Sequence, residues 1–500
     1  TKQPKKTQAI LTGSVEKSVG DQPTADSESL YLGTRFGGSS RFSGYAGAFG
    51  ALMDRPSQEL WFDGRSSKSG MVNAGFNLGK FNMNILAYKD SGDFEMQRGV
   101  REDGTIDNAM WYYDPLKASV LSTDMGIQWT PSQTTLLNFF KTKFEQEEHN
   151  GSFINTTMRE SSYDEETEGM GIRHNAVFGN TLFQAGGQIS NSNALSAGSK
   201  WNTYDTRVIG WSASVEQKFL EGDLTFDAGY RQDKKHIDES GAEDVNEDVD
   251  MAPSKVLAAG TFWRITNTYT FNGRYYHGKQ GTVGDFDMRL VDDATPHPEK
   301  QERIELSVSA DYASFFKPAF TWFNIDTKNK KSSTSDTYEI NDATYYYYAE
   351  SDDLRRGLEV MVKGKILKNT TYRASWTHML KNESTSDGVT TDSIGKSNPE
   401  NLYSFALTHN WNAYRANLSV RKVGEWQNSR SPMGMAETGG LGGYTRIDVN
   451  LKRDFQLKNI LLNTTLFCRN LGNEHYTTRY VTGFYYDRGR TLGLELSFAY

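Results

Sequence analysis

The chain has 500 residues, a formal net charge of -8 and a single cysteine, Cys468. The negative charge argues against a general nucleic-acid-binding role, because such proteins bind phosphates through an excess of Lys and Arg. The lone cysteine excludes an internal disulfide and any metal site built from several cysteines. Only 36% of the residues are hydrophobic, yet 13% are aromatic. This composition is typical of a barrel that has a thin apolar outer band, aromatic girdles and a wet lumen.

The sequence contains no apolar run that approaches the roughly 18 residues of a transmembrane helix, so any membrane crossing must use strands. No proline-rich or low-complexity linker divides it, which predicts one continuous domain rather than the several that its length suggests. A secretory signal peptide is not visible at Thr1, and an exported barrel needs one. We therefore expect the chain to be a mature or trimmed product.

Amphipathic segments that alternate apolar and polar residues follow one another along the whole chain, and about 22 of them are predicted as strands. Short turns separate the two members of a pair, for example at residues 79–80, 131–132 and 179–180, and longer polar loops separate one pair from the next. The predicted strands cover residues 7–18, 28–37, 41–53, 68–79, 81–90, 119–130, 134–146, 167–178, 181–192, 207–219, 223–234, 254–265, 267–278, 300–315, 317–330, 353–365, 369–382, 400–411, 413–426, 443–454, 460–470 and 489–500.

Loop lengths distinguish a membrane barrel from a soluble all-β protein, because both alternate along their strands. Turns of a few residues on one side and loops of roughly 10–30 residues on the other are the pattern of periplasmic turns and extracellular loops. An even strand count also puts both termini on the short-turn side. The sequence therefore predicts an all-β fold, a transmembrane antiparallel β-barrel of about 22 strands.

The last predicted strand, 489–500, has one apolar face and one small or polar face. We expect it to close the barrel by pairing with the segment near Ala9–Lys17, so that no sheet edge remains. Its aromatic end is typical of outer-membrane barrels and predicts a signal for the barrel assembly machinery. The residues of this assembly signal are Leu494, Leu496, Phe498 and Tyr500.

Four motifs follow one another in the second half of the chain. Residues 298–306 read Pro-Glu-Lys-Gln-Glu-Arg-Ile-Glu-Leu, and residues 443–451 read Gly-Tyr-Thr-Arg-Ile-Asp-Val-Asn-Leu. Residues 469–476 read Arg-Asn-Leu-Gly-Asn-Glu-His-Tyr, and residues 487–491 read Asp-Arg-Gly-Arg-Thr. In this order the motifs resemble the barrel of TonB-dependent outer-membrane receptors, although Arg488 stands where their Pro-Gly-Arg motif has proline.

The N-terminus also resembles this family, since Thr1-Lys2-Gln3-Pro4 is similar to the end of the strand that completes their plug domain. The resemblance implies that residues 1–8 are the tail of a plug and its linker, and that residues 9–500 are the barrel. The plug and its TonB box are then trimmed, supplied as a separate polypeptide or never present, and the sequence leaves these possibilities open. A barrel of about 22 strands needs a plug to be closed, because its own side chains do not fill the lumen.

The resemblance implies a receptor or transporter in the outer membrane of a Gram-negative bacterium, among lipopolysaccharide and outer-membrane lipid. The TonB–ExbB–ExbD complex would act on it through the plug. We expect active uptake of a scarce nutrient, with a ferric siderophore, the commonest cargo of the family, as the first choice. A plugless passive pore and a haem or cobalamin receptor stay open as alternatives. No catalytic cluster or phosphate-binding glycine loop is visible, so we expect neither an enzyme nor a covalent cofactor.

Two aromatic clusters in predicted loops are candidates for substrate binding, because exposed rings stack on flat ligands such as a catecholate, porphyrin or corrin. The alternative is that these rings belong to the outer aromatic girdle or pack loop on loop. The first cluster lies in the predicted loop near 91–118, and the second lies before Ala349. Their residues are Trp111, Tyr112, Tyr113, Tyr345, Tyr346, Tyr347 and Tyr348.

Residues 274–277 lie where many receptors of this family have a Phe-Arg-x-Pro motif, although this chain lacks the proline. Arg274 has the parity of the polar positions, which predicts that it faces the lumen and meets an anionic ligand or a plug carboxylate. Tyr276 is a second candidate on this segment. His277 and His297 offer imidazoles to haem iron, although a solvated loop histidine is the commoner case.

Acidic runs predict either solvated loops or sites for a divalent cation, since closely spaced carboxylates bind Ca²⁺ or bridge lipopolysaccharide phosphates. Two such runs lie at residues 145–148 and 164–168. A third lies at residues 243–250, but it has neither the Asp-x-Asp-x-Asp-Gly pattern nor a bidentate Glu at the right offset. Its candidate Ca²⁺ ligands are therefore weak ones: Asp244, Asp248 and Asp250.

Overall fold

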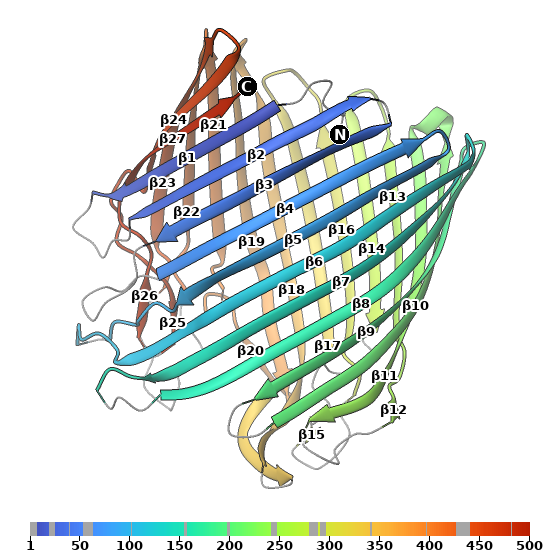
Figure 1. Ribbon diagram of the computed structural model, residues 1–500. Helices are drawn as coiled ribbons and strands as arrows, with labels where there is room; N and C mark the ends of the chain where they lie inside the picture. The colour runs from blue at the N-terminus through green and yellow to red at the C-terminus, as the bar shows by residue number, and fades with distance from the viewer. Residues whose placement is uncertain are drawn as a thin grey trace.

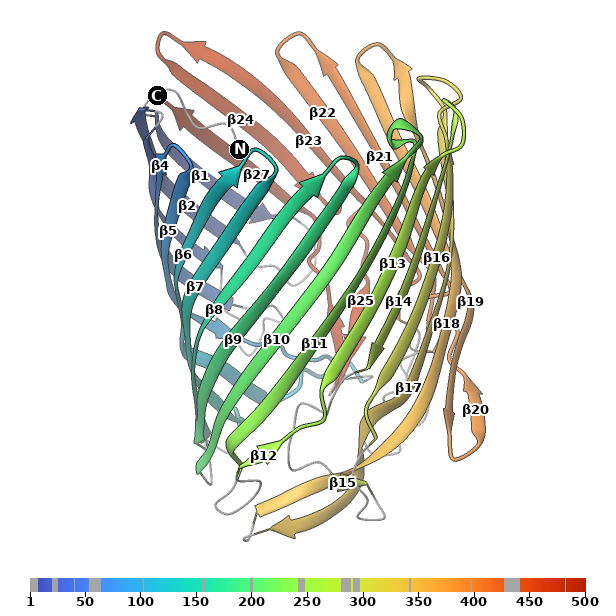
Figure 2. The ribbon, with the colours of Figure 1, turned by 90° about the vertical axis from the view of Figure 1, so that its right-hand side faces the viewer.

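The computed structural model describes residues 8–19, 26–39, 41–53, 64–101, 103–154, 158–197, 201–241, 248–279, 289–290, 297–340, 343–396, 398–426, 441–481 and 483–500. These residues form an antiparallel sheet of 22 long strands that closes on itself as a barrel. Figures 1 and 2 show the strands tilted and following one another in chain order around the wall. The predicted transmembrane β-barrel is confirmed. Among the described residues, no helix has the length and apolar character needed to cross a membrane.

The first eleven strands of the wall are β1 Gln8–Ser18, β2 Ser27–Ser39, β3 Phe42–Met53, β4 Gly64–Leu78, β5 Phe81–Glu95, β6 Ala109–Thr130, β7 Gln133–Ser152, β8 Met158–Phe178, β9 Thr181–Ala197, β10 Trp201–Phe219 and β11 Leu224–Gly241. The others are β13 Ser254–Arg264, β14 Tyr269–Lys279, β16 Lys300–Ala310, β17 Lys317–Ile340, β18 Ala343–Leu367, β19 Thr370–Ser386, β21 Asn401–Trp411, β22 Tyr414–Val423, β23 Tyr444–Leu457, β24 Ile460–Arg469 and β27 Thr491–Ala499. Short elements in the connections are η1 Leu220–Gly222, β12 Val249–Asp250, β15 Arg289–Leu290, β20 Val389–Asp392, β25 Thr477–Tyr480 and β26 Phe484–Tyr486.

The barrel closes between its first and last strands, as the sequence predicts. β27 pairs with β1 on one side, in a register that places Ile10 opposite Ala499, and with β24 on the other. Backbone hydrogen bonds between Ala9 and Tyr500, with N–O distances of 3.0 and 2.9 Å, extend this pairing to the last residue. The wall strands therefore leave no open edge.

The two faces of the wall follow from strand pairing, because directly opposed residues on neighbouring strands share a face. One face carries large exposed apolar side chains such as Leu306, Leu466 and Leu494. It is the outer face, which contacts the lipid. The other face is polar and lines the lumen, where the hydroxyls of Thr12 and Ser497 bond across the closing strands at 2.8 Å. The predicted apolar face of the last strand is therefore its lipid face.

Aromatic side chains of the outer face gather at both rims of the apolar band. At the rim nearer the termini, the rings of Trp411 and Tyr414 stack with centroids 5.4 Å apart. At the other rim, the rings of Trp376 and Tyr403 stack with centroids 6.4 Å apart. Aromatic belts of this kind lie at membrane–water interfaces, so these pairs agree with the predicted girdles.

The two ends of the barrel differ in the length of their connections. Turns of a few residues, such as 79–80 and 179–180, join the strands at the end where both termini lie (Figure 1). Gly79 and Gly179 have φ angles of 68° and 57°, a left-handed conformation that glycine adopts without strain. The longer connections lie at the opposite end. The predicted asymmetry is confirmed, with short periplasmic turns and long extracellular connections.

Several strands extend further toward the extracellular end than the sequence predicts. β6 begins at residue 109 rather than 119, and β18 begins at residue 343 rather than 353. The predicted loop positions of the two aromatic clusters and of the acidic runs at 145–148 and 164–168 are therefore wrong, because all of them lie in strands. Beyond the membrane the outer face carries charged side chains such as Lys141, so the apolar alternation stops while the backbone pairing continues.

Candidate functional site in the lumen

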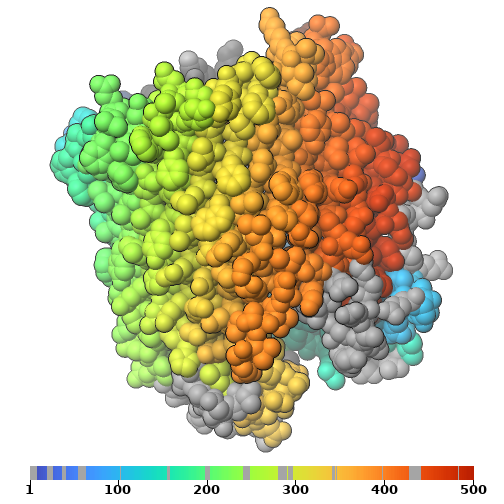
Figure 3. All heavy atoms as spheres, turned by 180° about the vertical axis from the view of Figure 1, so that it is seen from behind, coloured from blue at the N-terminus to red at the C-terminus, as the bar shows by residue number. Residues whose placement is uncertain are grey.

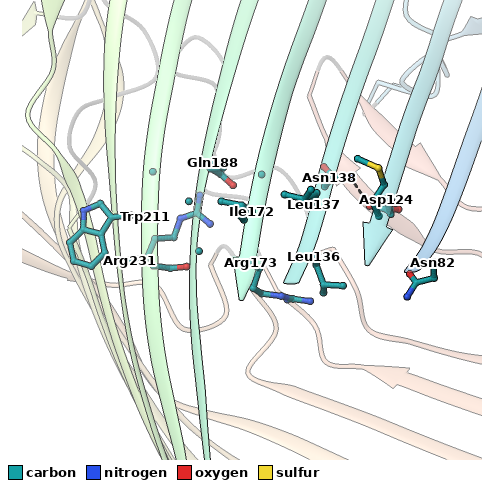
Figure 4. Close-up of a pocket in the computed structure, with 16 residues that line it drawn as sticks. Asn82, Asp124, Leu136, Leu137, Asn138, Ile172, Arg173, Gln188, Trp211 and Arg231 are labelled. Carbon is teal, nitrogen blue, oxygen red and sulfur yellow. Dashed lines mark hydrogen bonds between the residues drawn. The ribbon is translucent and has the colours of Figure 1, made fainter. Parts of the chain in front are cut away.

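A recess of about 480 Å³ lies in the lumen wall across β5 to β11 (Figure 4). The amide of Asn138 donates to the Asp124 carboxylate at 2.6 Å, and this pair forms part of the floor of the recess. Trp211 also borders the recess, but its ring points away from Arg231 in Figure 4, toward the outer face. The polar side chains that line the recess are Asn82, Asp124, Asn138, Arg173, Gln188 and Arg231.

Inward-facing glycines create this recess. Gly171, Gly186 and Gly210 lie on three neighbouring strands and contribute no side chains of their own to the lumen face. The Asp233 carboxylate lies over Gly210, and one of its oxygens would stand 1.9 Å from a Cβ at that position. Nε and Nη2 of Arg231 hold this carboxylate at 2.7 and 2.9 Å. The recess therefore presents a fixed bidentate arginine–aspartate pair to the lumen.

A second pocket, of about 330 Å³, lies nearer the extracellular end, where the wall meets residues 470–490. We call these residues the last connection, because they join β24 to β27. Arg65 of β4, Arg446 of β23, Arg469 of β24 and Arg488 of the last connection line the pocket, which we call the arginine pocket. Guanidinium groups bind carboxylates and phosphates through paired hydrogen bonds, so this pocket suits an anion.

Glu16 organises one half of the arginine pocket. The residue is only 6% exposed, and its carboxylate lies 3.3 Å from Nη1 of Arg469 and 3.7 Å from Nη1 of Arg488. The hydroxyl of Thr491, which is 1% exposed, donates to the same carboxylate. These partners offset the cost of burying a charge, and they join the first strand of the barrel to the last one.

Arg446 organises the other half. Its Nε donates to Asp448 at 2.9 Å, and its Nη1 donates to Asp487 at 3.3 Å. The phenol of Tyr476 donates to the same Asp487 carboxylate, and burial together with this hydrogen bond raises the pKa of Tyr476. Arg65 is different, because it is exposed and has no acidic partner among the described residues. One positive charge of the pocket therefore stays open to the lumen.

The last connection is held to the wall by Asn470, which is 1% exposed. The Asn470 amide donates to the backbone carbonyls of Glu474 and Arg488 at 2.9 and 3.1 Å. Its side-chain oxygen accepts the backbone N–H of Glu474 at 2.9 Å. These bonds tie the start of the connection to its end, which gives the sequence motif at residues 469–476 a structural role.

Replacement of Asn470 by alanine is expected to loosen the last connection. The change leaves two buried carbonyls and one N–H without their partners, at a cost of about 2 kcal/mol or more. Hydrogen exchange of β25 and β26, measured by mass spectrometry, should become at least about tenfold faster, while exchange in the wall strands stays unchanged. Asn82→Ala, at an exposed lumen position, is the matched control. Equal exchange in the two variants would contradict this role of Asn470.

The connection between β5 and β6 packs against the last connection. Val100 pairs with Phe484 of β26 through backbone bonds of 2.8 and 2.7 Å. Gly99 and Gly483 approach so closely that a Cβ on either would stand less than 3.0 Å from the opposite backbone. The two connections therefore form one packed unit beside the arginine pocket, in which larger residues would not fit at the contact.

The first predicted aromatic cluster lies near the extracellular end of β6. The rings of Trp111 and Tyr113 are 6.4 Å apart, and Tyr112 stacks on His149 with a centroid distance of 4.5 Å. Trp111 is 37% exposed. The ring of Tyr112 therefore packs against a neighbouring strand of the wall, as the alternative of packing among protein segments predicts. The role of the cluster in substrate binding stays a prediction.

The second predicted aromatic cluster lies on β18, which is not a neighbour of β6, so the structure does not bring the two clusters together. The ring of Tyr347 lies 4.7 Å from that of Tyr338 on β17, whereas Tyr346 is 56% exposed. The backbone of Tyr345 belongs to β18, and its side chain lies outside the described part of the structure. Binding by this cluster also stays a prediction.

Residues 274–277 lie on β14 and alternate between the two faces of the wall. Arg274 lies on the lumen face, where its Nη1 is 3.1 Å from the Asp227 carboxylate, and Tyr276 shares that face. His277 lies on the outer face and is paired with Glu302, at 3.1 Å between Nδ1 and Oε1. The predicted place of His277 in a loop or the lumen is therefore corrected, because strand parity turns this imidazole away from any ligand in the lumen.

The acidic run near β12 surrounds a histidine rather than an open site. Asp250 lies 2.6 Å from the Lys234 ammonium and 3.0 Å from Nδ1 of His236, and Asp248 lies 3.4 Å from Nε2 of the same ring. Asp244 lies outside the described residues. Within the described ranges, no group of three or more His, Cys, Asp or Glu side chains is arranged to hold a metal ion. Calcium binding here stays a prediction.

Sequence reasoning did not single out the residues that form the two lumen pockets. Arg488 was visible only as a departure from a motif, and neither Glu16 nor Arg65 stood out as a candidate. The signal that was available is parity, since Glu16 alternates with the outward Val15 and Lys17, and this places a carboxylate on the lumen face. The sequence does not show which distant arginines such a carboxylate meets.

Together, these features define an outer-membrane β-barrel with two polar pockets on its lumen wall. Comparisons with known proteins agree with this class. Neither a protein-family model nor a curated protein sequence matches the chain. Solved structures do match it over nearly its whole length, and their similarity is in the fold.

The ferric citrate transporter FecA in its unliganded form matches with a TM-score of 0.83 and 14% identity, over 100% of this chain and 79% of that chain. BauA, the ferric preacinetobactin receptor from Acinetobacter baumannii, matches with a TM-score of 0.77 and 13% identity, over 100% of this chain and 80% of that chain. The copper transporter OprC matches with a TM-score of 0.77 and 11% identity, over 99% of this chain and 81% of that chain.

The chain therefore has the barrel fold of TonB-dependent outer-membrane receptors, which confirms the fold that the sequence motifs predict. Its location in an outer membrane agrees with this fold. The similar structures are named as transporters or receptors. At identities of 11–14% the cargo does not follow from these names.

Proposed function

We propose that this barrel takes part in TonB-dependent uptake of a ferric siderophore across the outer membrane of a Gram-negative bacterium, and that the chelate it prefers is anionic. The observation that carries the proposal is the arginine pocket at the extracellular end of the lumen. Its four guanidinium groups face three carboxylates, those of Glu16, Asp448 and Asp487. The surplus charge sits on the exposed Arg65, where a ligand entering from outside would meet it first.

The chemistry of the pocket fits carboxylate-bearing chelates better than neutral ones. A charged hydrogen bond contributes about 1.5–3 kcal/mol, and a guanidinium group offers two parallel donors to one carboxylate. FecA and BauA are named for ferric chelates, which supports this cargo class, whereas OprC is named for copper and shows that the fold alone does not fix the cargo.

In this proposal the recess across β5 to β11 serves a second purpose deeper in the lumen. A plug domain, which the TonB–ExbB–ExbD complex acts on, would pack against this wall. Arg173 and the fixed pair of Arg231 and Asp233 offer it hydrogen-bonding groups of both charges. The glycines at the recess let a plug segment approach the wall backbone closely.

Arg65→Gln is expected to weaken binding of ferric citrate by about 10- to 100-fold, because it removes one charged hydrogen-bond donor. Binding of ferrioxamine B, a cationic chelate, should not weaken. Quenching of tryptophan fluorescence in the purified protein measures both affinities. Arg35→Gln is the matched control, because Arg35 is an exposed arginine on the lumen face of β2 near the opposite end.

The siderophore proposal fails if iron limitation leaves expression unchanged and no iron chelate quenches the protein. If Arg65→Gln weakens binding of both chelates equally, the proposal of siderophore uptake stands, but the preference for an anionic cargo is refuted. Single-channel conductance separates the alternative of a passive pore. A large ungated conductance that a plug does not close would favour the pore over the importer.

A further inference from the structure

Four lysines face one another in a single row across neighbouring strands of the wall. Lys255 of β13 is directly opposite Lys279 of β14, which is opposite Lys300 of β16, which is opposite Lys328 of β17. Directly opposed side chains have their Cβ atoms about 4.5–5.5 Å apart, and like charges in this arrangement repel. We call this set the lysine row, and its strands form part of the wall in view in Figure 3.

The lysine row lies on the outer face, just beyond the apolar band. On β13 the outward residue two positions nearer the periplasmic end is Leu257, which is 44% exposed. On β14 and β16 the corresponding positions hold the paired His277 and Glu302, and the next positions hold Tyr275 and Ile304. The lysines therefore lie one or two outward-facing positions past the last apolar residue. Lipid headgroups meet the wall at this level.

Carboxylates compensate only one end of the lysine row. The Lys328 ammonium lies 3.1 Å from Asp352 and 3.5 Å from Asp326. For Lys255, Lys279 and Lys300, no carboxylate of a described residue lies within 4.0 Å. Lys255 and Lys300 are exposed, and Lys279 is half-buried. The fold therefore holds three positive charges side by side at the membrane surface.

By contrast, the lysines at the corresponding level of β6 and β7 are compensated. Lys117 lies 3.9 Å from Glu145, Lys143 lies 2.7 Å from Glu145, and Lys141 contacts Glu166. These side chains are also on the outer face: Lys141 is directly opposite Leu121, and Lys117 and Lys143 lie beyond it. The directly opposed lysines without a carboxylate partner therefore lie in one sector of the circumference, around β13 to β16.

We propose that the lysine row binds the phosphate groups of lipopolysaccharide in the outer leaflet. A phosphate between two ammonium groups turns the repulsion between neighbouring strands into attraction, and each basic residue near an anionic headgroup strengthens binding. The acyl chains of the same molecule would lie along the apolar band directly beside the row. This site goes beyond transport of a cargo, and its test does not depend on the cargo.

The test uses the triple variant Lys255→Gln, Lys279→Gln and Lys300→Gln, purified in neutral detergent without lipid. Bisphosphorylated lipid A should bind this variant about 10- to 100-fold more weakly than the unchanged chain, measured by native mass spectrometry. Dephosphorylated lipid A should bind both weakly and equally. The matched control, Lys117→Gln with Lys141→Gln and Lys143→Gln, removes the same charge and should stay within about twofold of the unchanged chain.

A second measurement separates lipid binding from a purely structural role. Without lipid the triple variant should melt at the same temperature as the unchanged chain or higher, because the opposed like charges are gone. With bisphosphorylated lipid A the order should reverse. If the triple variant does not assemble, Lys279→Gln alone takes its place, since Lys279 faces a lysine on either side. Undiminished binding by the variant, equal loss in the control, or equal binding of dephosphorylated lipid A would overturn the proposal.

Discussion

Removal of β27 together with Tyr500 is expected to abolish accumulation of the barrel in the outer membrane. β27 pairs with β1 and β24 at once, so its loss leaves two strands with unpaired backbone groups facing hydrocarbon. Each unpaired backbone group costs several kcal/mol in a membrane. Summed along two strand edges, this cost exceeds the whole stability of an ordinary domain. The shift between folded and unfolded bands on gels run without heating, applied to isolated outer membranes, measures the assembled fraction.

Deletion of Tyr500 alone tests the predicted assembly signal apart from closure. The Tyr500 ring is 69% exposed, so its loss removes little packing, although the backbone bonds to Ala9 go with it. We expect a strong fall in the assembled fraction in cells and successful refolding of the same variant in detergent. Deletion of residues 242–247, between β11 and β12 in the sequence, is the control and should assemble normally. Normal assembly without Tyr500 would show that this residue is not the signal.

The periplasmic halves of the strands could be predicted from the sequence, and the extracellular halves could not. β7 was expected over 134–146 and β10 over 207–219, and both end within a residue of the predicted periplasmic boundary. Their extracellular ends lie at residues 152 and 201 instead. Inside the membrane one face must be apolar, so alternation is visible, whereas beyond it both faces meet water and only backbone pairing defines the strand.

The lumen pockets could not be predicted for a different reason. Parity places Arg65 and Arg469 on the inner face, but their proximity depends on how far the barrel curves and on where the last connection folds. Around the wall, β27, β1, β2 and β3 lie between Arg469 on β24 and Arg65 on β4. The buried Glu16 that links Arg469 to Arg488 becomes recognisable only when the register of β1 against β27 is known.

Glu16→Gln is expected to destabilise the closed barrel by about 3 kcal/mol or more, because it breaks a buried ion-pair network. The change leaves Arg469 and Arg488 beside a neutral amide, and the side chain of Arg488 is only 15% exposed, so its charge would stay buried without compensation. Thr491 would lose its charged acceptor at the same time. The urea concentration at half-unfolding in detergent, followed by tryptophan fluorescence, should fall clearly, and the last connection should become accessible to protease. Glu28→Gln is the matched control, because Glu28 is an exposed glutamate on the neighbouring β2 and its change should be nearly neutral. Equal stability of the two variants would show that the closing strands hold together without the Glu16 network.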